Sequence, residues 1–180
     1  MISRMKIWQL DFDVENYEGF QIIDEDWSVV EQFDGRSLAN TWNPIELKLI
    51  EEEPRLRSDA PYFVGVPVFS ARAVELLEPL IHDCAEILPM KFAREDYFII
   101  NVTAILDCIN MEQAEVVRFR SGRIMKFNKY AFIPEAIAGR NIFKLIEMPK
   151  QTIFVSDTFR EKVLGAGELT GFKFNEVWSM

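Results

Sequence analysis

The sequence is poor in the side chains that most enzymes use as catalytic bases. Its 180 residues include a single histidine, His82, and histidine is the usual general base near neutral pH. His82 lies at the end of an expected helix, where an imidazole interacts favourably with the helix C-terminus. Cys84 is two residues further on, and residues i and i+2 of a helix do not face each other. We therefore expect a structural histidine and no Cys–His dyad.

Ligand patterns for metals and cofactors are missing as well. No group of residues has the spacing of a zinc ribbon, an HExxH helix or an EF-hand loop. The segment GAGEL (165–169) follows an expected helix, whereas a phosphate-binding loop precedes one. Carboxylate pairs such as Glu95 with Asp96, or Asp107 with Glu112, could act as acid and base, but 29 acidic residues produce such pairs by chance. The sequence predicts no catalytic residue, no metal and no cofactor.

Long hydrophobic runs are also absent. None approaches the roughly 20 residues of a membrane helix, and the start, MISRMKIWQL, is too short and polar for the core of a signal peptide. The two cysteines, Cys84 and Cys108, lie in apolar segments, and we expect them to be buried and reduced. These features predict a cytoplasmic protein without a membrane partner. The length and the 49% hydrophobic content predict one domain over residues 1–180.

Basic residues are missing from residues 7–35, near the N-terminus of the chain. The formal net charge is -9, and residues 7–35 contain nine acidic side chains and no basic one. We call this segment the acidic block; its acids are Asp11, Asp13, Glu15, Glu18, Asp24, Glu25, Asp26, Glu31 and Asp34. Its aromatic residues are Trp8, Phe12, Tyr17, Phe20, Trp27 and Phe33. The rest of the chain is nearly balanced in charge.

Aromatic rings among like charges suit an interface for a basic partner. The rings supply buried area, and the charges accelerate encounter and exclude wrong partners. The alternative is that the rings belong to the core and the acids form a solvated face. The candidate partner-binding residues are Asp11, Asp13, Glu15, Glu18, Asp24, Glu25, Asp26, Trp27 and Glu31.

A patch of the opposite charge lies on an expected hairpin. Segments 115–120 and 123–133 flank Ser121 and Gly122, a spacing that fits a two-residue turn. The basic residues of this hairpin are Arg118, Arg120, Arg123, Lys126 and Lys129. Together with nearby aromatic rings they could contact phosphate. A chain this acidic would repel nucleic acid elsewhere, so the preferred interpretation is an exposed strand face that protects a sheet edge.

The clearest secondary structure signal is the segment Phe69–Met90. Ser70 is a good N-cap, and Pro79 predicts a kink or an early end after roughly three turns. The residues that share one helical face are Ala73, Leu76, Leu77, Leu80, Ile81 and Cys84. Strands are expected on either side, at Val66–Phe69 and at Glu86–Met90, where Pro89 favours a sheet edge or a strand end.

A second unit of the same kind follows near the C-terminus. A strand at Ile153–Val155 leads to Ser156 as N-cap and to a helical pattern formed by Phe159, Val163 and Leu164. Gly165 and Gly167 can end this helix. A strand over 169–178 completes the unit, and the repetition indicates a loose internal duplication.

The remaining segments predict strands and one brief helix. Strands are expected at 5–11, 45–50 and 141–147, and 97–106 is interpreted as one central strand covered on both faces. Asp24 is the expected cap of a brief helix that Gly35 ends, and 134–139 is expected to be a connector. The fold class is α+β, with two or three short helices on a mostly antiparallel sheet.

Several motifs together resemble a known family. In chain order they are MKIWQLD (5–11), TWNP (41–44), DAPYF (59–63), VPVFSARAVELLEPL (66–80), EILPM (86–90), YFIINV (97–102), LDCI (106–109), IFKL (142–145), IFVSDTF (153–159) and LTGFKF (169–174). The chain resembles the bacterial polymorphic-toxin immunity proteins of the myxobacterial-type family, long described as a domain of unknown function.

The resemblance implies an intracellular protein without catalysis, which binds a cognate toxin made by the same cell and blocks it. The matching positions cap helices, shape turns or fill cores, so they should specify the fold and leave partner choice to other surface segments. They are Trp42, Pro44, Pro61, Ser70, Leu77, Pro89, Asn101, Asp107, Phe143, Ser156, Gly171 and Phe174. The acidic block is then the candidate surface, and a basic toxin such as a nuclease the expected partner.

Two other function classes stay open at this stage. One is a hydrolase that uses a pair of carboxylates in a cleft, which a preformed pocket with raised carboxyl pKa values would favour. The other is a nucleic-acid-binding module that uses the basic hairpin over 118–129.

Overall fold

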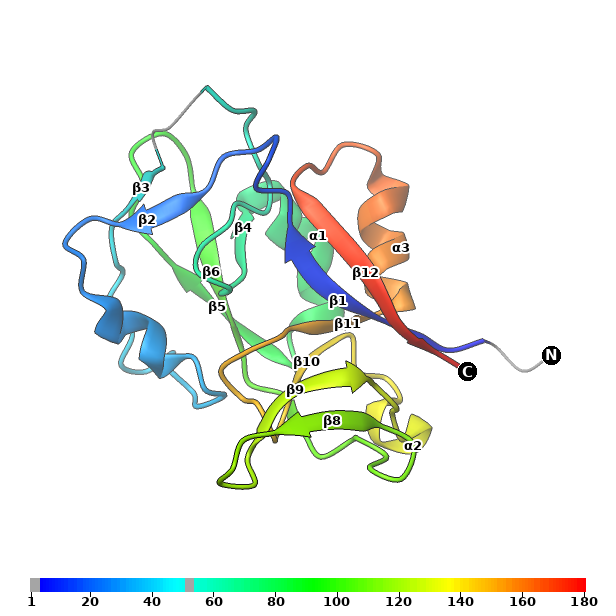
Figure 1. The fold of residues 1–180 in the computed structure, drawn as a ribbon. Helices are drawn as coiled ribbons and strands as arrows, with labels where there is room; N and C mark the ends of the chain where they lie inside the picture. Colours follow the sequence, from blue (N-terminus) through cyan, green and yellow to red (C-terminus); the bar gives the residue numbers. More distant parts are fainter. Residues whose placement is uncertain (1–3, 51–53) are drawn as a thin grey trace.

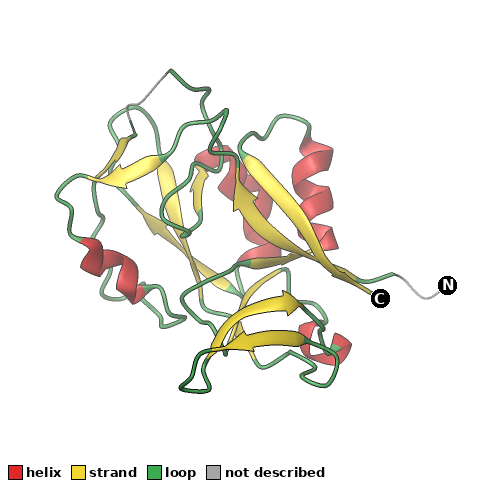
Figure 2. Ribbon diagram, viewed as in Figure 1, coloured by secondary structure: helices red, strands yellow, loops and turns green. Residues whose placement is uncertain are grey.

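The computed structural model describes residues 4–50 and 54–180, and most of its regular structure is antiparallel strand (Figures 1 and 2). The strands are β1 (Lys6–Phe12), β2 (Phe20–Ile22), β3 (Leu47–Leu49), β4 (Val68–Ser70), β5 (Ala85–Pro89), β6 (Tyr97–Val102), β7 (Ile105–Leu106), β8 (Glu115–Arg118), β9 (Ile124–Lys129), β10 (Ile142–Leu145), β11 (Phe154–Ser156) and β12 (Phe172–Ser179). The helices are the 3₁₀ helix η1 (Trp27–Gln32), α1 (Ala71–Ile81), α2 (Pro134–Ile137) and α3 (Asp157–Ala166). The α+β class is confirmed.

The strands form several sheets, whereas the sequence predicts one. The largest has the order β12-β1-β11-β10-β7, and only its β10–β7 pair is parallel. A second sheet has the order β4-β6-β5, and β2–β3 and β8–β9 are two-stranded. β5 is therefore at an edge and ends at Pro89, as that proline predicts.

The two Ser-capped units have one topology. In the first, β4 and β5 lie on either side of β6, and in the second, β11 and β12 lie on either side of β1. The central strand is antiparallel to both neighbours in each case. The two strands joined by the helix therefore run in the same direction, one strand apart. The predicted pair of strand–helix–strand units is confirmed, and both units contribute their helix to one core.

The predicted caps begin both helices. The Ser70 hydroxyl accepts a hydrogen bond from the Ala73 amide at 3.3 Å, and the Ser156 hydroxyl accepts one from the Phe159 amide at 3.1 Å. Helix α1 ends at Ile81, two residues after its internal proline. Helix α3 ends at Gly167, whose φ of 70° is left-handed. Gly165, expected to help end α3, lies inside it.

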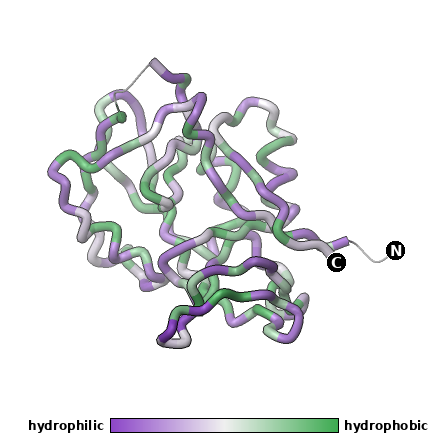
Figure 3. The backbone as a smooth tube through the Cα atoms, viewed as in Figure 1, coloured by the Kyte–Doolittle hydropathy of each residue, from purple (hydrophilic) through white to green (hydrophobic). Residues whose placement is uncertain are grey.

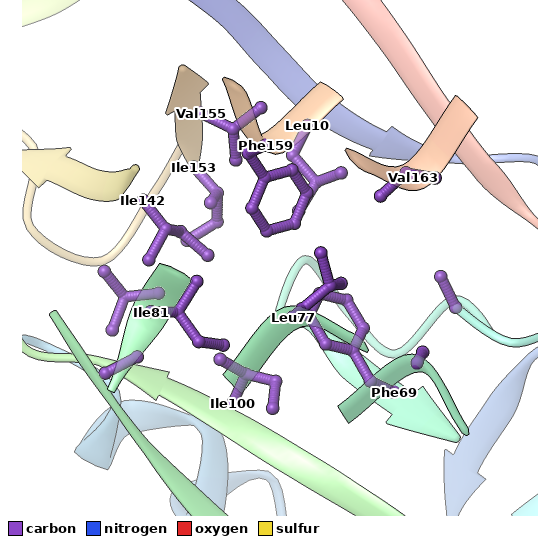
Figure 4. Packing of buried hydrophobic residues seen from close by; sticks show 14 of the residues in the cluster. Leu10, Phe69, Leu77, Ile81, Ile100, Ile142, Ile153, Val155, Phe159 and Val163 are labelled. Atoms are coloured by element: carbon purple, nitrogen blue, oxygen red, sulfur yellow. The ribbon is translucent and has the colours of Figure 1, made fainter. Parts of the chain in front are cut away.

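The main core lies where α1 and α3 pack on each other and on the sheets (Figure 4). On α1, the predicted face is confirmed at its centre, since Leu77 and Ile81 are fully buried. Leu76 and Leu80 are only half-buried, and Val74 takes a buried place that the pattern missed. On α3, Phe159 is fully buried and contacts Phe69 from the first unit at 6.5 Å between ring centroids.

One predicted strand is broken in two. β6 ends at Val102, and β7 pairs with β10 in the other sheet. The amides of Thr103 and Ala104 both donate to the Cys84 carbonyl, at 2.9 and 3.0 Å. These two hydrogen bonds turn the chain from one sheet to the other, so the prediction of one strand over 97–106 was wrong.

The turn of the β8–β9 hairpin is longer than predicted. Its loop has three residues, Arg120 to Gly122. The Gly122 amide donates to the Phe119 carbonyl, and the Phe119 amide donates to the Arg123 carbonyl, both at 2.9 Å, so Phe119 and Arg123 close the loop. Gly122 has a φ of 86°, the left-handed position of such a loop. Elsewhere, the expected connector over 134–139 contains the single-turn helix α2.

A buried carboxylate joins the two units. Asp59 is fully buried and accepts two hydrogen bonds from the Arg72 guanidinium, each at 2.7 Å. It also accepts from the Ser70 hydroxyl at 2.6 Å and from the Thr170 amide at 2.9 Å. Burial opposes ionisation, but the hydrogen bonds from Arg72 and Ser70 hold the Asp59 pKa well below its usual range. The start of α1 and the segment before β12 therefore share one anion.

A close approach next to this anion requires glycine. Gly171 has a φ of 85°, and a Cβ atom placed there would lie 1.9 Å from the Ser58 hydroxyl oxygen. Ser58 is itself fully buried. A residue with a Cβ atom at this position would force the buried Ser58 side chain to shift and would hold a strained backbone conformation, so glycine is strongly favoured.

Packing at the centre of α1 should dominate its contribution to stability. Leu77→Ala should lower the free energy of unfolding by about 2–5 kcal/mol, because it leaves a cavity in the core. Leu164→Ala on α3 is the matched control, since Leu164 is 54% exposed, and it should change stability by less than about 0.5 kcal/mol. Urea unfolding measures both, and equal losses would contradict this description of the core.

The clash at Gly171 can be separated from its backbone conformation. Gly122 has nearly the same φ, but a Cβ atom placed on it would have no neighbouring atom within 4 Å. Gly122→Ala should therefore cost only the left-handed conformation, about 1 kcal/mol. Gly171→Ala should cost about 1–3 kcal/mol more, because Ser58 must also shift. Similar unfolding midpoints for the two variants would show that the close approach has no energetic effect.

Candidate partner-binding surface

The first acids of the block act within the chain. The Asp13 carboxylate accepts from the backbone amides of Glu15 and Asn16, both at 3.1 Å, and so closes the turn after β1. A side-chain hydrogen bond from Asn16 is the main reason that the Asp13 pKa is lowered. The Asp11 carboxylate accepts from the next amide at 2.9 Å. These two acids shape the loop that leads to β2.

Glu18 is engaged in an ion pair. Its two carboxylate oxygens lie 2.9 and 2.7 Å from the Arg94 guanidinium, and its side chain is only 14% exposed. Glu15 is exposed, and its backbone carbonyl accepts from Arg55 at 2.8 Å. The predicted site residues up to Glu18 are thus largely committed to intramolecular contacts.

The later acids form a continuous exposed surface. Residues 23–28 are all exposed, and we call them the acidic ridge; they are Ile23, Asp24, Glu25, Asp26, Trp27 and Ser28. The Trp27 side chain is 53% exposed and the Ile23 side chain 44%. A tryptophan this exposed is a large apolar surface without a protein neighbour to cover it. The acidic block is therefore divided, and the ridge is its longest continuous exposed stretch.

Hydrogen bonds between residues two apart in the chain fix the shape of the ridge. The Asp24 carboxylate accepts from the Asp26 amide at 3.3 Å, and the Asp26 carboxylate accepts from the Ser28 amide at 3.1 Å. Asp26, not the predicted Asp24, is thus the cap of the short helix, which is 3₁₀ and not α. The hydrogen bond from the Ser28 hydroxyl is the main cause of the lowered Asp26 pKa. Glu25 has a φ of 57°, a left-handed conformation that residues other than glycine seldom adopt.

A buried lysine holds the far end of η1. The Lys144 ammonium on β10 donates to the Phe33 carbonyl at 2.8 Å, and the residue is 4% exposed. Burial lowers the Lys144 pKa to about 8, although nearby Asp34 opposes this shift. A second tie is the ion pair between Lys150 and Glu31 at 2.6 Å. The ridge is therefore anchored to the five-stranded sheet.

The ridge borders a groove of about 410 Å³. Its lining residues are Ile22, Ile23, Asp24, Asp26, Val29, Asn43, Pro44, Ile45, Glu46 and Lys91. Apolar side chains are thus combined with three carboxylates and one ammonium. Such a groove suits the aliphatic stem and charged head of a long basic side chain.

Neither Glu95 nor the pair His82 and Cys84 has the environment that its candidate catalytic role requires. Glu95 is bound by the Arg57 guanidinium at 2.7–2.9 Å, which lowers the Glu95 pKa, whereas a general acid needs a raised one. His82 is exposed beyond the end of α1, and Cys84 is fully buried. Both cysteines are free and buried, as predicted. Among the described residues, no three His, Cys, Asp or Glu side chains converge as metal ligands.

Comparison with known families gives the same grouping as the sequence motifs. A model of the Immunity protein family (Imm11) matches residues 19–179. The chain belongs to this family. The resemblance to immunity proteins is therefore confirmed. No curated protein matches the chain. None of the helices within 4–50 and 54–180 is long and apolar enough to cross a membrane.

The motif positions of this family member mostly hold the fold. Ser70 and Ser156 cap helices, and Gly171 allows a close approach. The Trp42 indole donates to the Pro89 carbonyl at 2.7 Å. Asp107 and Pro89 are exposed, but the Pro89 carbonyl still accepts this hydrogen bond. The exposed ridge lies outside these positions, although it is inside the matched range.

Sequence reasoning missed Lys144, although a signal was present. In the strand motif IFKL, this lysine is the one charged residue among apolar residues, and all four residues of the motif are buried. Its neighbours Phe143 and Leu145 are buried on one side of β10, and Lys144 is buried on the other. Only the position of η1 over that side explains why the ammonium is covered.

The lowered Lys144 pKa predicts a pH dependence of stability. In the unfolded chain this lysine titrates near its ordinary value of 10.5, and in the folded protein near 8. Between these two pH values the unfolded state binds more protons than the folded state. The free energy of unfolding should therefore rise with pH in this range, by about 1.4 kcal/mol for each pH unit. Lys144→Met should flatten this rise, whereas Lys126→Met at an exposed position should retain it. Urea unfolding at about pH 7.5 to 10.5, in roughly half-unit steps, measures it; identical curves would contradict the prediction.

Proposed function

We propose that this protein binds a cognate bacterial toxin and neutralises it without catalysis, through the acidic ridge. Membership of the Immunity protein family (Imm11) supports toxin neutralisation. The observation that supports this surface is the 53% exposure of Trp27 beside Asp24, Glu25 and Asp26. An exposed ring supplies an anchor for a partner, and the acids around it select a partner of positive charge.

A basic toxin fits this surface best, and a nuclease is one class of that kind. The groove beside the ridge adds Glu46 to the carboxylates and supplies an apolar floor. A lysine or arginine of the toxin could bury its stem there and place its charge between the carboxylates. The protein acts in this proposal as one domain of residues 1–180 in the cytoplasm of the toxin-producing cell.

Glu31 belongs to the proposed surface only indirectly. Its ion pair with Lys150 holds η1 in place, and the Glu31 side chain is still 73% exposed. The earlier acids contribute to the negative potential that attracts a basic partner, while Asp13 and Glu18 keep their structural contacts. The direct contacts are assigned to residues 23–27.

Charge reversal on the ridge tests this function. Asp24→Lys combined with Glu25→Lys should slow association with the toxin by at least about tenfold at low salt, because steering is lost. The partner to test is the cognate toxin domain, sought first in the gene directly upstream, and association is measured by stopped-flow or surface plasmon resonance. Asp26 is left intact because it caps η1.

A matched control changes the same charge elsewhere. Glu161→Lys with Glu168→Lys alters exposed residues on and just after α3, on the opposite side of the molecule from η1 (Figure 1). This variant should associate within about threefold of the wild-type rate, since only the net charge differs. Equal slowing by both variants would remove the ridge from the mechanism, and unchanged rates in both would remove electrostatic steering altogether.

A further inference from the structure

A pocket of the opposite character lies between the β8–β9 loop and the turn that follows β10. Its volume is about 530 Å³, within the usual range for small-molecule sites. The lining residues are Met111, Arg118, Gly122, Arg123, Ile124, Glu147, Met148, Pro149, Lys150 and Gln151. Figure 3 shows the hydrophilic tip of the hairpin at this end of the molecule. The proposed toxin contacts at residues 23–27 do not include this pocket.

Each of its three cations is held in place by another group. Arg118 donates to the Gly122 carbonyl at 2.8 Å across the hairpin loop. The Arg123 guanidinium lies over the Phe119 ring, 5.9 Å from its centroid. Lys150 is tethered by Glu31 at 2.6 Å. An anion that enters the pocket therefore meets positive charge whose positions are already restricted, which reduces the entropy lost on binding.

The rest of the lining is apolar and adaptable. Met111 is 43% exposed, and Ile124, Met148 and Pro149 are partly buried. Methionine side chains adjust to the shape of a bound group. The pocket therefore offers a charged part and an apolar part to one ligand.

The single acid of the pocket is in an environment that disfavours negative charge. Glu147 is partly buried, and its Oε2 atom is buried without a hydrogen-bond partner. Burial raises the Glu147 pKa, and the charge of nearby Asp107 adds to this. A nearby bound anion would favour the protonated acid further. Glu147 thus opposes anion binding less than an exposed carboxylate would.

We propose that this pocket binds a small organic oxyanion, with a phosphate or carboxylate head on Arg118, Arg123 and Lys150 and an apolar body on Met111, Ile124 and Met148. Arginine forks match both kinds of head, because each presents two oxygens in one plane. A nucleic acid strand fits less well, since Glu31 beside Lys150 and the ridge beyond it would repel a polyanion.

Titration of the full chain with defined probes tests this site. The probes are inorganic phosphate, phenyl phosphate, phenylacetate and a short DNA duplex. Binding of each probe is measured by calorimetry and by changes in the NMR methyl resonances of methionine. Phenyl phosphate or phenylacetate should bind one to one, with shifts at Met111 and Met148, and more tightly than inorganic phosphate because the ring adds apolar contact. Preference for one of the two organic probes identifies the head group as phosphate or carboxylate.

Two variants of the same loop provide the control. Arg123→Glu should weaken binding of the organic probe by at least about tenfold, and Arg120→Glu, whose residue does not line the pocket, by less than about twofold. Glu147→Gln should bind at least as tightly as the wild type at neutral pH. Absence of binding by every small probe, binding of DNA alone, or equal losses in the two arginine variants would each overturn the proposal.

Discussion

The buried carboxylate of Asp59 is the interaction on which the arrangement of the two units depends. An ionised carboxylate without exposure is tolerated only when it is paired and hydrogen-bonded, and here Arg72, Ser70 and Thr170 satisfy it. Ser70 begins α1, and Thr170 precedes β12, so the anion fixes the first unit against the second. Because α1 and α3 share one core, the burial of Phe69 against Phe159 requires this relative position.

Acidic side chains have two different kinds of surroundings in this protein. Carboxylates such as Glu18 and Glu95 are enclosed by arginines and hold loops together. On the ridge, Asp24 and Asp26 bind only backbone and hydroxyl groups of the ridge itself. Within the described part of the chain no cation pairs with them, so they project a negative potential beside an exposed tryptophan. This difference separates acids paired with arginine from acids whose charge is left without a cation.

The ridge and the basic pocket are neighbours through one ion pair. Glu31 on η1 binds Lys150, which lines the pocket. Both sites also depend on β10, since Lys144 within it holds the end of η1 and the turn after it forms the pocket wall. β10 and the turn after it therefore support both surfaces. The proposed toxin-binding surface therefore lies next to the proposed anion site.

The local patterns of the sequence determined the elements of this protein. Ser70, Pro79, Ser156 and Gly167 set the ends of two helices, because caps, proline and left-handed glycine act within one turn. The charge of residues 7–35 was also fixed by sequence alone. Only the tertiary structure decided which acids stay accessible, where the strand over 97–106 divides, and why Lys144 is buried. Those outcomes depend on contacts between residues far apart in the chain, such as Glu18 with Arg94, and no short-range pattern encodes them.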